Sequence, residues 1–210
     1  MIKIPYKNIP FGPYLFQSRL PEAMIDRLYQ DGKQAGLVSH HKELAGHLHG
    51  QYHYNEDTVR WFLREISPYW AAYREGHSNF FKLEHRKMQV ISDELWINFM
   101  KAGDYNPLHT HGGHYSFVIF LDIPKDLPIE QEKWEGNSSP PGSLRFDFTQ
   151  FALPPWAMTS QTVLPQRGDI YIFPALLLHT VCPFKCEGTR VSVSGNWKIK
   201  DFDSFPQGYF

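Results

Sequence analysis

The chain has 210 residues, of which 42% are hydrophobic, 20% are charged and 16% are aromatic. These proportions allow one folded domain with a substantial core, and they exclude a disordered chain, a collagen and a coiled coil. Lys and Arg (21) nearly balance Asp and Glu (22), so the charge gives no argument for binding nucleic acid or an anionic membrane. The 16 prolines and 15 glycines favour a turn-rich β fold, and the eleven histidines are the unusual feature of the composition.

The sequence offers few features of a secreted or membrane protein. Its two cysteines, Cys182 and Cys186, are too few for a disulfide framework or for a zinc site of their own. The first 16 residues lack the continuous apolar core of a signal peptide. The longest apolar run, residues 170–178, is roughly half the length of a membrane span. We therefore expect a soluble, cytoplasmic protein.

Residues 1–85 are predicted to be a largely helical extension of the same domain. Pro21 suits the first turn of a helix whose apolar residues recur at helical spacing. A second helix is expected to start near Asn55 or Asp57, and Pro68 should kink or split it. The histidines between the two helices follow no helical face, so we expect a solvated loop there. They are His40, His41, His47, His49 and His53.

In residues 86–210 the pattern changes to short segments rich in β-branched and aromatic residues. Turn-forming residues separate these segments, which is typical of a sandwich or barrel. Two long connections, residues 124–142 and 153–165, are candidate lids over a site. The predicted strands cover residues 88–91, 95–100, 115–123, 144–148, 168–173 and 189–199.

The most informative segment is Gly103-Asp-Tyr-Asn-Pro-Leu-His109-Thr-His111-Gly-Gly-His114. On an extended strand, His109 and His111 would point to the same face, roughly 6.6 Å apart along the chain. Two imidazoles on one face can bind the same metal ion. A His-x-His pair is weak evidence by itself, and the alternative is a polar loop between two strands.

A second segment strengthens the case for a metal. His179 ends a strongly apolar run, where an imidazole needs a hydrogen-bond partner or a metal ion. A simple chain reversal near residues 184–185 would place Arg190 across from His179 on the same face. Arg190 and Ser192 share a face as well, and together they form a receptor for a carboxylate. The alternative is a surface arginine on an edge strand.

These two segments resemble 2-oxoglutarate/Fe(II)-dependent oxygenases, in particular the prolyl-4-hydroxylase-like branch found in marine bacteria and their phages. The resemblance covers about residues 95–199 and is carried by WINFMKAGDYNPLHTHGGHYSFVIFLDIP and GDIYIFPALLLHTVCPF…GTRVSVSGNW. It implies a mainly β (α+β) fold: a double-stranded β-helix (jelly roll, cupin-like) with N-terminal helices packed on the outside. Residues 86–210 would form its catalytic core. It also implies that His109 and His179 bind iron and that Arg190, helped by Ser192, binds the distal carboxylate of 2-oxoglutarate.

The departure from the family pattern is His111, which stands where Asp or Glu is usual. Three interpretations remain open. His111 is itself the third ligand, giving a three-histidine site; or His114 takes that place, because Gly112-Gly113 could swing it inward. In the third, a ligand position is vacant, as in family members that halogenate.

A three-histidine jelly roll also points to the cupins. Gly103 keeps the spacing of the first cupin motif relative to His109, but the acidic residue expected after His111 is missing. Both families share the same barrel, so the predicted fold holds for either. The pair Arg190-x-Ser192 separates them, because a cupin has no reason to keep it.

The leading hypothesis is a dioxygenase that hydroxylates a small molecule or a peptide, with a peptidyl proline nearest to the resemblance. Fe(II) and 2-oxoglutarate as cosubstrate are the expected cofactors, and ascorbate is a candidate addition. Asn98 and Tyr105 are further candidates for cofactor binding.

We expect no nucleic-acid or membrane partner, and a homodimer is the candidate oligomeric state. The alternatives are a cupin-type metalloenzyme that does not use 2-oxoglutarate and a non-catalytic jelly-roll binding module. The apolar wall of the site is expected to consist of Phe117, Ile119, Ile172 and Leu177.

Overall fold

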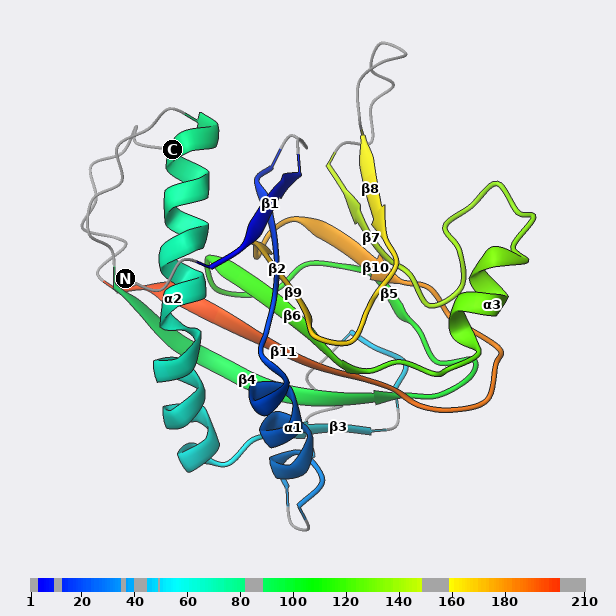
Figure 1. Ribbon diagram of the computed structural model, residues 1–210, viewed down its shortest axis with the longest axis horizontal. Helices are drawn as coiled ribbons and strands as arrows, with labels where there is room; N and C mark the ends of the chain where they lie inside the picture. Colours follow the sequence, from blue (N-terminus) through cyan, green and yellow to red (C-terminus); the bar gives the residue numbers. More distant parts are fainter. Residues whose placement is uncertain are drawn as a thin grey trace.

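The computed structural model consists of two facing β-sheets, with two helices packed on the outer side of the larger sheet (Figure 1). The structure describes residues 4–9, 13–34, 37–39, 45–48, 50–81, 89–148 and 159–200. The predictions for His40, His41, His49 and residues 153–158 of the second long connection lie outside these residues.

The larger sheet contains seven strands in the order β1-β2-β9-β6-β11-β4-β3, all paired antiparallel. These strands are β1 Tyr6–Ile9, β2 Leu15–Arg19, β3 Gly50–His53, β4 Val90–Met100, β6 Tyr115–Asp122, β9 Asp169–Pro174 and β11 Arg190–Ile199. The smaller sheet has the order β5-β10-β7-β8, also antiparallel. Its strands are β5 Asn106–His109, β7 Leu144–Asp147, β8 Ser160–Val163 and β10 Leu178–Val181.

From β4 to β11 the chain passes repeatedly from one sheet to the other. This path, with two antiparallel sheets face to face, is that of a double-stranded β-helix. The predicted jelly roll is therefore confirmed. Within it, the two segments expected on either side of residues 92–93 form a single strand, β4, whose pairing with β11 is irregular between Asn196 and Trp197.

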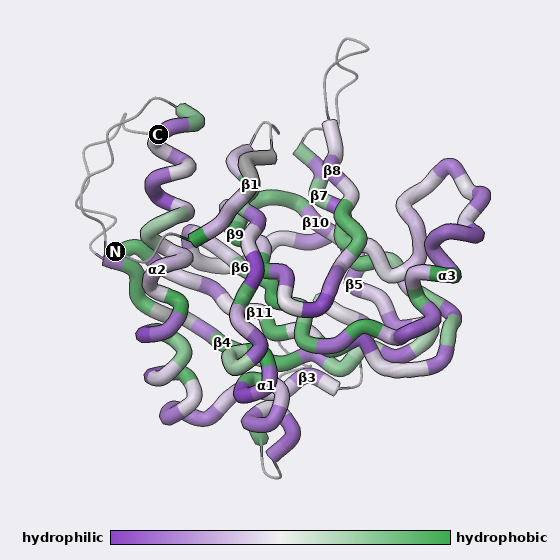
Figure 2. The backbone as a smooth tube through the Cα atoms, in the orientation of Figure 1, coloured by the Kyte–Doolittle hydropathy of each residue, from purple (hydrophilic) through white to green (hydrophobic). Residues whose placement is uncertain are grey.

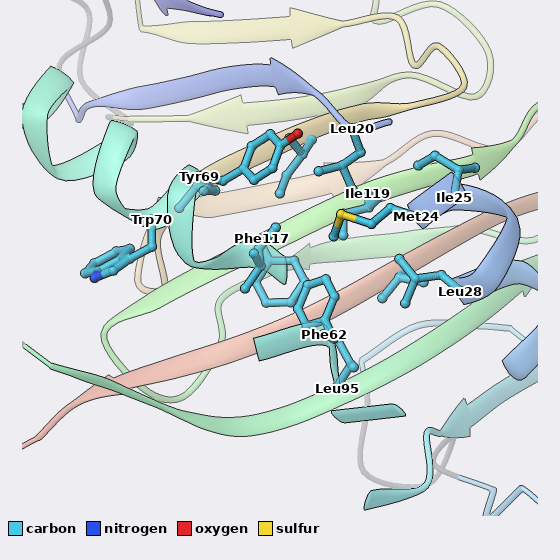
Figure 3. Close-up of a cluster of buried hydrophobic side chains, with 14 of the residues drawn as sticks. Leu20, Met24, Ile25, Leu28, Phe62, Tyr69, Trp70, Leu95, Phe117 and Ile119 are labelled. Carbon is cyan, nitrogen blue, oxygen red and sulfur yellow. The ribbon is translucent and has the colours of Figure 1, made fainter. Parts of the chain in front are cut away.

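Helix α1, Glu22–Asp31, begins directly after Pro21, as the sequence indicates. Its apolar residues Met24, Ile25 and Leu28 are buried against the larger sheet. The long helix α2, Glu56–Phe81, covers the same face, where Phe62 stacks on Phe117 of β6 with 5.4 Å between ring centroids (Figure 3). Both helices thus lie outside the barrel, as predicted. A third, short helix, α3, spans Leu127–Glu132 in the first long connection.

Pro68 does not split α2, which continues through it. A proline at this position cannot donate to the carbonyl oxygen of Arg64, four residues earlier. The hydroxyl of Ser67 donates to that oxygen instead, at 2.8 Å. A side chain therefore replaces the missing backbone hydrogen bond. Of the two expected effects of Pro68, a kink or a split, the split is therefore wrong.

The expectation of a largely helical N-terminal part was incomplete, because residues 1–85 also supply β1, β2 and β3 to the larger sheet. β2 pairs with β9, and β3 pairs with β4. Leu15 and Phe16 of β2 are fully buried. These strands have four or five residues each. β2 and β3 pair with distant segments, so local periodicity gave little sign of them.

Two apolar clusters hold the layers together. One lies between the larger sheet and the two helices, and the other lies between the two sheets. In Figure 2 the hydrophobic stretches lie mainly in the middle of the molecule. No helix among the described residues is both long and apolar enough to cross a membrane.

Candidate metal centre and cosubstrate pocket

A cavity of about 370 Å³ opens between the two sheets. Alternate residues of the neighbouring strands β4 and β11 point into this cavity. On β11, the intervening Val191 and Val193 pack toward the helices. The pairing of β11 with β4 arranges the inward residues in four opposed pairs. These pairs are Arg190 with Met100, Ser192 with Asn98, Ser194 with Trp96, and Asn196 with Glu94.

Three histidines converge on the opposite side of this cavity. His109 of β5 is the register partner of His179 of β10, with 4.2 Å between ring centroids. The His111 ring lies 4.9 Å from each of the other two. One ring nitrogen from each histidine lies within 4.8 Å of the others. This geometry fits a single metal ion with three imidazole ligands.

Backbone contacts orient these imidazoles. The Nδ1 atoms of His109 and His179 lie 2.7 and 2.8 Å from the carbonyl oxygens of Pro107 and Leu177. Such contacts fix the tautomer and direct the Nε2 atoms toward the shared centre. His111 lies beyond the end of β5, where its backbone N–H donates to Ala175. It therefore reaches the centre through a chain bend, whereas the sequence argument relied on strand alternation.

Burial keeps the cluster neutral. Burial, followed by the neighbouring His109 and His111, lowers the pKa of His179 to about 3, and burial followed by His109 lowers that of His111 to about 4. Burial also lowers the pKa of His109. Neutral imidazoles offer the lone pair that a metal ion requires. The donor set thus fits a divalent cation, with three nitrogens where the family pattern has two nitrogens and one carboxylate.

His114 is not brought into this cluster, so the geometry does not support it as a reserve ligand. Its Nδ1 accepts a hydrogen bond from the backbone N–H of Ile199 at 3.0 Å. Its own backbone N–H donates to Trp197, and its carbonyl oxygen accepts from Ala175. These contacts tie it to the end of β11, and Gly113, with a φ of 82°, makes the turn that leads there.

Arg190 lies at one end of the cavity and is 3% exposed. The structure places no acidic side chain in an ion pair with it among the described residues. Its Nη1 contacts Met100 Sδ at 3.2 Å, its guanidinium stacks over Phe120, and its Nε has no hydrogen-bond partner. Burial lowers its pKa to about 10, so it remains a cation near neutral pH. A buried, uncompensated guanidinium requires an anion.

Asn98 organises the polar groups beside Arg190. Its Oδ1 accepts from Gln51 Nε2 at 2.8 Å and from Trp96 Nε1 at 3.1 Å. Its Nδ2 donates to the hydroxyls of Ser192 and Ser194 at 3.5 and 3.3 Å. The predicted set Arg190, Ser192 and Asn98 therefore lines one continuous surface.

Three sequence expectations about the site need correction. His179 and Arg190 do not form a hairpin, because β10 belongs to the smaller sheet and β11 to the larger one. Tyr105 does not line the cavity; it is 42% exposed and pairs with His47. Ile119 and Ile172 pack toward the helices. Of the four expected wall residues, Phe117 lines the cavity, whereas Leu177 does not. The apolar lining residues are Leu48, Met100, Phe117, Val118, Leu144, Phe173 and Val181.

Sequence reasoning missed five polar lining residues: Gln51, Glu94, Asn106, Thr110 and Ser194. Strand alternation could have found two of them, because Glu94 continues the face of Asn98 and Ser194 continues that of Ser192. No local signal pointed to Gln51, which reaches the cavity only through the pairing of β3 with β4.

The fold and the site define a jelly-roll protein in which three converging histidines face a buried arginine across one cavity. Residues 94–196 match the family model described as putative 2OG-Fe(II) oxygenase. Within these residues the chain is similar to the 2-oxoglutarate/Fe(II)-dependent oxygenases, a class whose cofactors are iron and 2-oxoglutarate. No match was found among curated proteins.

Solved structures support the same fold. The viral collagen prolyl hydroxylase of Paramecium Bursaria Chlorella virus-1 superposes with a TM-score of 0.54 and 14% identity, over 89% of this chain and 96% of that one. A prolyl-4-hydroxylase of Pseudomonas putida gives 0.53 and 15%, over 89% and 93%. HygX of Streptomyces hygroscopicus, with nickel and 2-oxoglutarate bound, gives 0.57 and 11%, over 90% and 84%. At these identities the likeness concerns the fold alone.

Proposed function

We propose that this oxygenase hydroxylates a C–H bond of a small molecule or a peptide. His109, His111 and His179 would hold Fe(II), and Arg190, Ser192 and Asn98 would hold the far carboxylate of 2-oxoglutarate. When bound, the metal and the cosubstrate supply the oxidation of the substrate, coupled to decarboxylation of 2-oxoglutarate to succinate. Ascorbate is a candidate addition to the assay. The cytoplasmic location, the homodimeric state and the assignment of residues 86–210 as the catalytic core stay predictions.

The buried guanidinium of Arg190 is the observation that carries the proposal. It shares one cavity with the three histidines, and its Nε lacks a hydrogen-bond partner. A dicarboxylate bound at the metal through one end could neutralise this charge with the other. A cupin-type enzyme without 2-oxoglutarate would leave the charge uncompensated.

The protein's own contribution is orientation and the exclusion of water. Asn98, fixed by Gln51 and Trp96, presents its amide beside the hydroxyl of Ser192. The apolar residues Leu144 and Phe173 of the cavity shield the centre from solvent.

Prolyl peptides are the first substrates to test. Two of the similar structures are prolyl hydroxylases by name, and the sequence resemblance points to the same branch. Hydroxyproline formation in a proline-containing peptide, followed by mass spectrometry, would support this finer assignment, and its absence with a broad peptide set would favour a small-molecule substrate.

The test of the proposal is a titration of iron-loaded protein with 2-oxoglutarate in the absence of oxygen. Metal-to-ligand absorption in the green should appear in the wild type. It should be weakened in Arg190→Ala and retained in the control Arg60→Ala, whose side chain lies on the exposed face of α2. Succinate release with Fe(II) and ascorbate should follow the same order. Equal succinate release in the wild type and Arg190→Ala would remove the assigned role of Arg190.

A further inference from the structure

The end of the cavity away from Arg190 carries a carboxylate that the proposed function does not use. This carboxylate belongs to Glu94, at the inward face of β4. We propose that Glu94 binds an ammonium group of the substrate and so selects amine-bearing compounds or lysine side chains. The inference rests on the proposed function, because it places the substrate beside the metal.

The strand register puts Glu94 on the substrate side of the metal centre. Arg190 and Asn196, which is paired with Glu94, are six residues apart on β11, or about 20 Å along the strand. The histidine cluster lies between these ends, since the His111 ring is 5.7 Å from the ring of Trp96. A cosubstrate that spans Arg190 and the metal therefore leaves the Glu94 end free for a second molecule.

Two buried polar side chains hold the carboxylate in place. Asn196 Nδ2 donates to Glu94 Oε2 at 3.1 Å, and Asn196 Oδ1 accepts from Ser116 Oγ at 2.7 Å. Asn196 is 3% exposed and Ser116 is 1% exposed. This chain of hydrogen bonds uses one carboxylate oxygen and leaves Oε1 for a ligand. A pre-oriented acceptor of this kind costs little to order when a ligand binds.

The charge of Glu94 is not compensated by the protein. Among the described residues, no lysine or arginine forms an ion pair with it, and Asn196 is its hydrogen-bond partner. A carboxylate that is partly removed from water in a cavity favours a cationic donor and repels an anion. An ammonium group provides both the charge and the N–H donors that Oε1 can accept.

The test measures how tightly probe compounds bind to protein loaded with Zn(II) and 2-oxoglutarate. Protein in this form does not turn over. In each of two pairs of probes, the first member carries an ammonium group that the second lacks: benzylamine with benzyl alcohol, and N-acetyl-lysine amide with N-acetyl-norleucine amide. The first pair represents a small-molecule source of the ammonium group, and the second represents a peptide source. For at least one pair, wild-type protein should bind the cationic member about tenfold more tightly, as a charge-assisted hydrogen bond allows.

Glu94→Gln should abolish this preference, and Glu94→Asp, which keeps the charge, should retain it. The control Glu187→Gln, at an exposed acid outside the cavity, should behave as the wild type. Equal affinity for both members of each pair in the wild type, or an unchanged preference in Glu94→Gln, would overturn the inference. If wild-type protein binds 2-oxoglutarate but shows no charge preference, only this inference fails. If it does not bind 2-oxoglutarate, the proposed function fails.

Discussion

His179 and Arg190 line one cavity from opposite sheets, although they are eleven residues apart in the chain. The chain leaves β10 of the smaller sheet after Val181 and enters β11 of the larger sheet at Arg190. This crossing separates the metal-binding side chains from the anion-binding side chain by the width of the cavity. A ligand with two acidic ends can therefore reach both sides at once.

The third metal ligand is predicted to be His111 and not His114. His111→Ala should weaken the binding of Fe(II) or Zn(II) strongly, because it removes a ligand nitrogen. The loss should exceed the roughly 10–100-fold that follows when a residue that only hydrogen-bonds to a metal ligand is removed. His114→Ala should keep the metal affinity but lower the free energy of unfolding by about 1 kcal/mol, since the Ile199 N–H loses its acceptor. Competition with a chelator and urea unfolding, on protein without a histidine tag, measure the two effects. If His114→Ala releases the metal while His111→Ala retains it, the assignment is wrong.

Much of this site could be predicted because its chemistry is local in sequence. His109, His179, Arg190 and Ser192 lie in short segments where residue type and spacing are informative, and the structure brings all four to one cavity. The β strands of residues 86–210 were also recognisable, because alternation of apolar and polar residues marks them directly.

The remaining features depend on pairing between distant segments. Alternation indicates that Ile119 and Phe120 face opposite ways, but it does not say which face meets the helices. For the same reason the sequence suggested a hairpin between His179 and Arg190, where the chain in fact changes sheets. Gln51 enters the cavity through β3, a strand of four residues that only its pairing with β4 defines.

Asn98 is predicted to stabilise the fold as well as the pocket. Asn98→Ala removes the acceptor of the Gln51 amide and of the Trp96 indole, all within the buried wall. Leaving such buried donors without a partner costs about 1–3 kcal/mol, so the urea midpoint should fall accordingly. The exposed control Gln166→Ala should change the free energy of unfolding by no more than about 0.5 kcal/mol. An unchanged midpoint in Asn98→Ala would show that the network adds no stability.

Cys186 is expected to react slowly with iodoacetamide until the pH is high. Burial and then the neighbouring Glu130 raise the pKa of the Cys186 thiol to about 11. Since the thiolate is the reactive form, only about one molecule in a hundred carries it at about pH 9, and the rate should still increase tenfold per pH unit there. Glu130→Gln should lower this pKa and speed the reaction near pH 8. Alkylation followed by mass spectrometry resolves each site, and a rate at Cys186 that levels off below about pH 9 would contradict the prediction.

Helix α2 is predicted to depend on one aromatic contact with the barrel. Phe62 is 1% exposed and stacks on Phe117, a residue that also belongs to the cavity lining. Phe62→Ala should lower the free energy of unfolding by about 3–5 kcal/mol, because the helix and the sheet cannot close the resulting void. Glu65→Ala, at an exposed position of the same helix, should leave it within about 0.5 kcal/mol. Since the void lies directly behind Phe117, the variant should also bind 2-oxoglutarate less tightly at temperatures where it stays folded. A loss of stability in Phe62→Ala no larger than that in Glu65→Ala would mean that α2 is held mainly by other contacts.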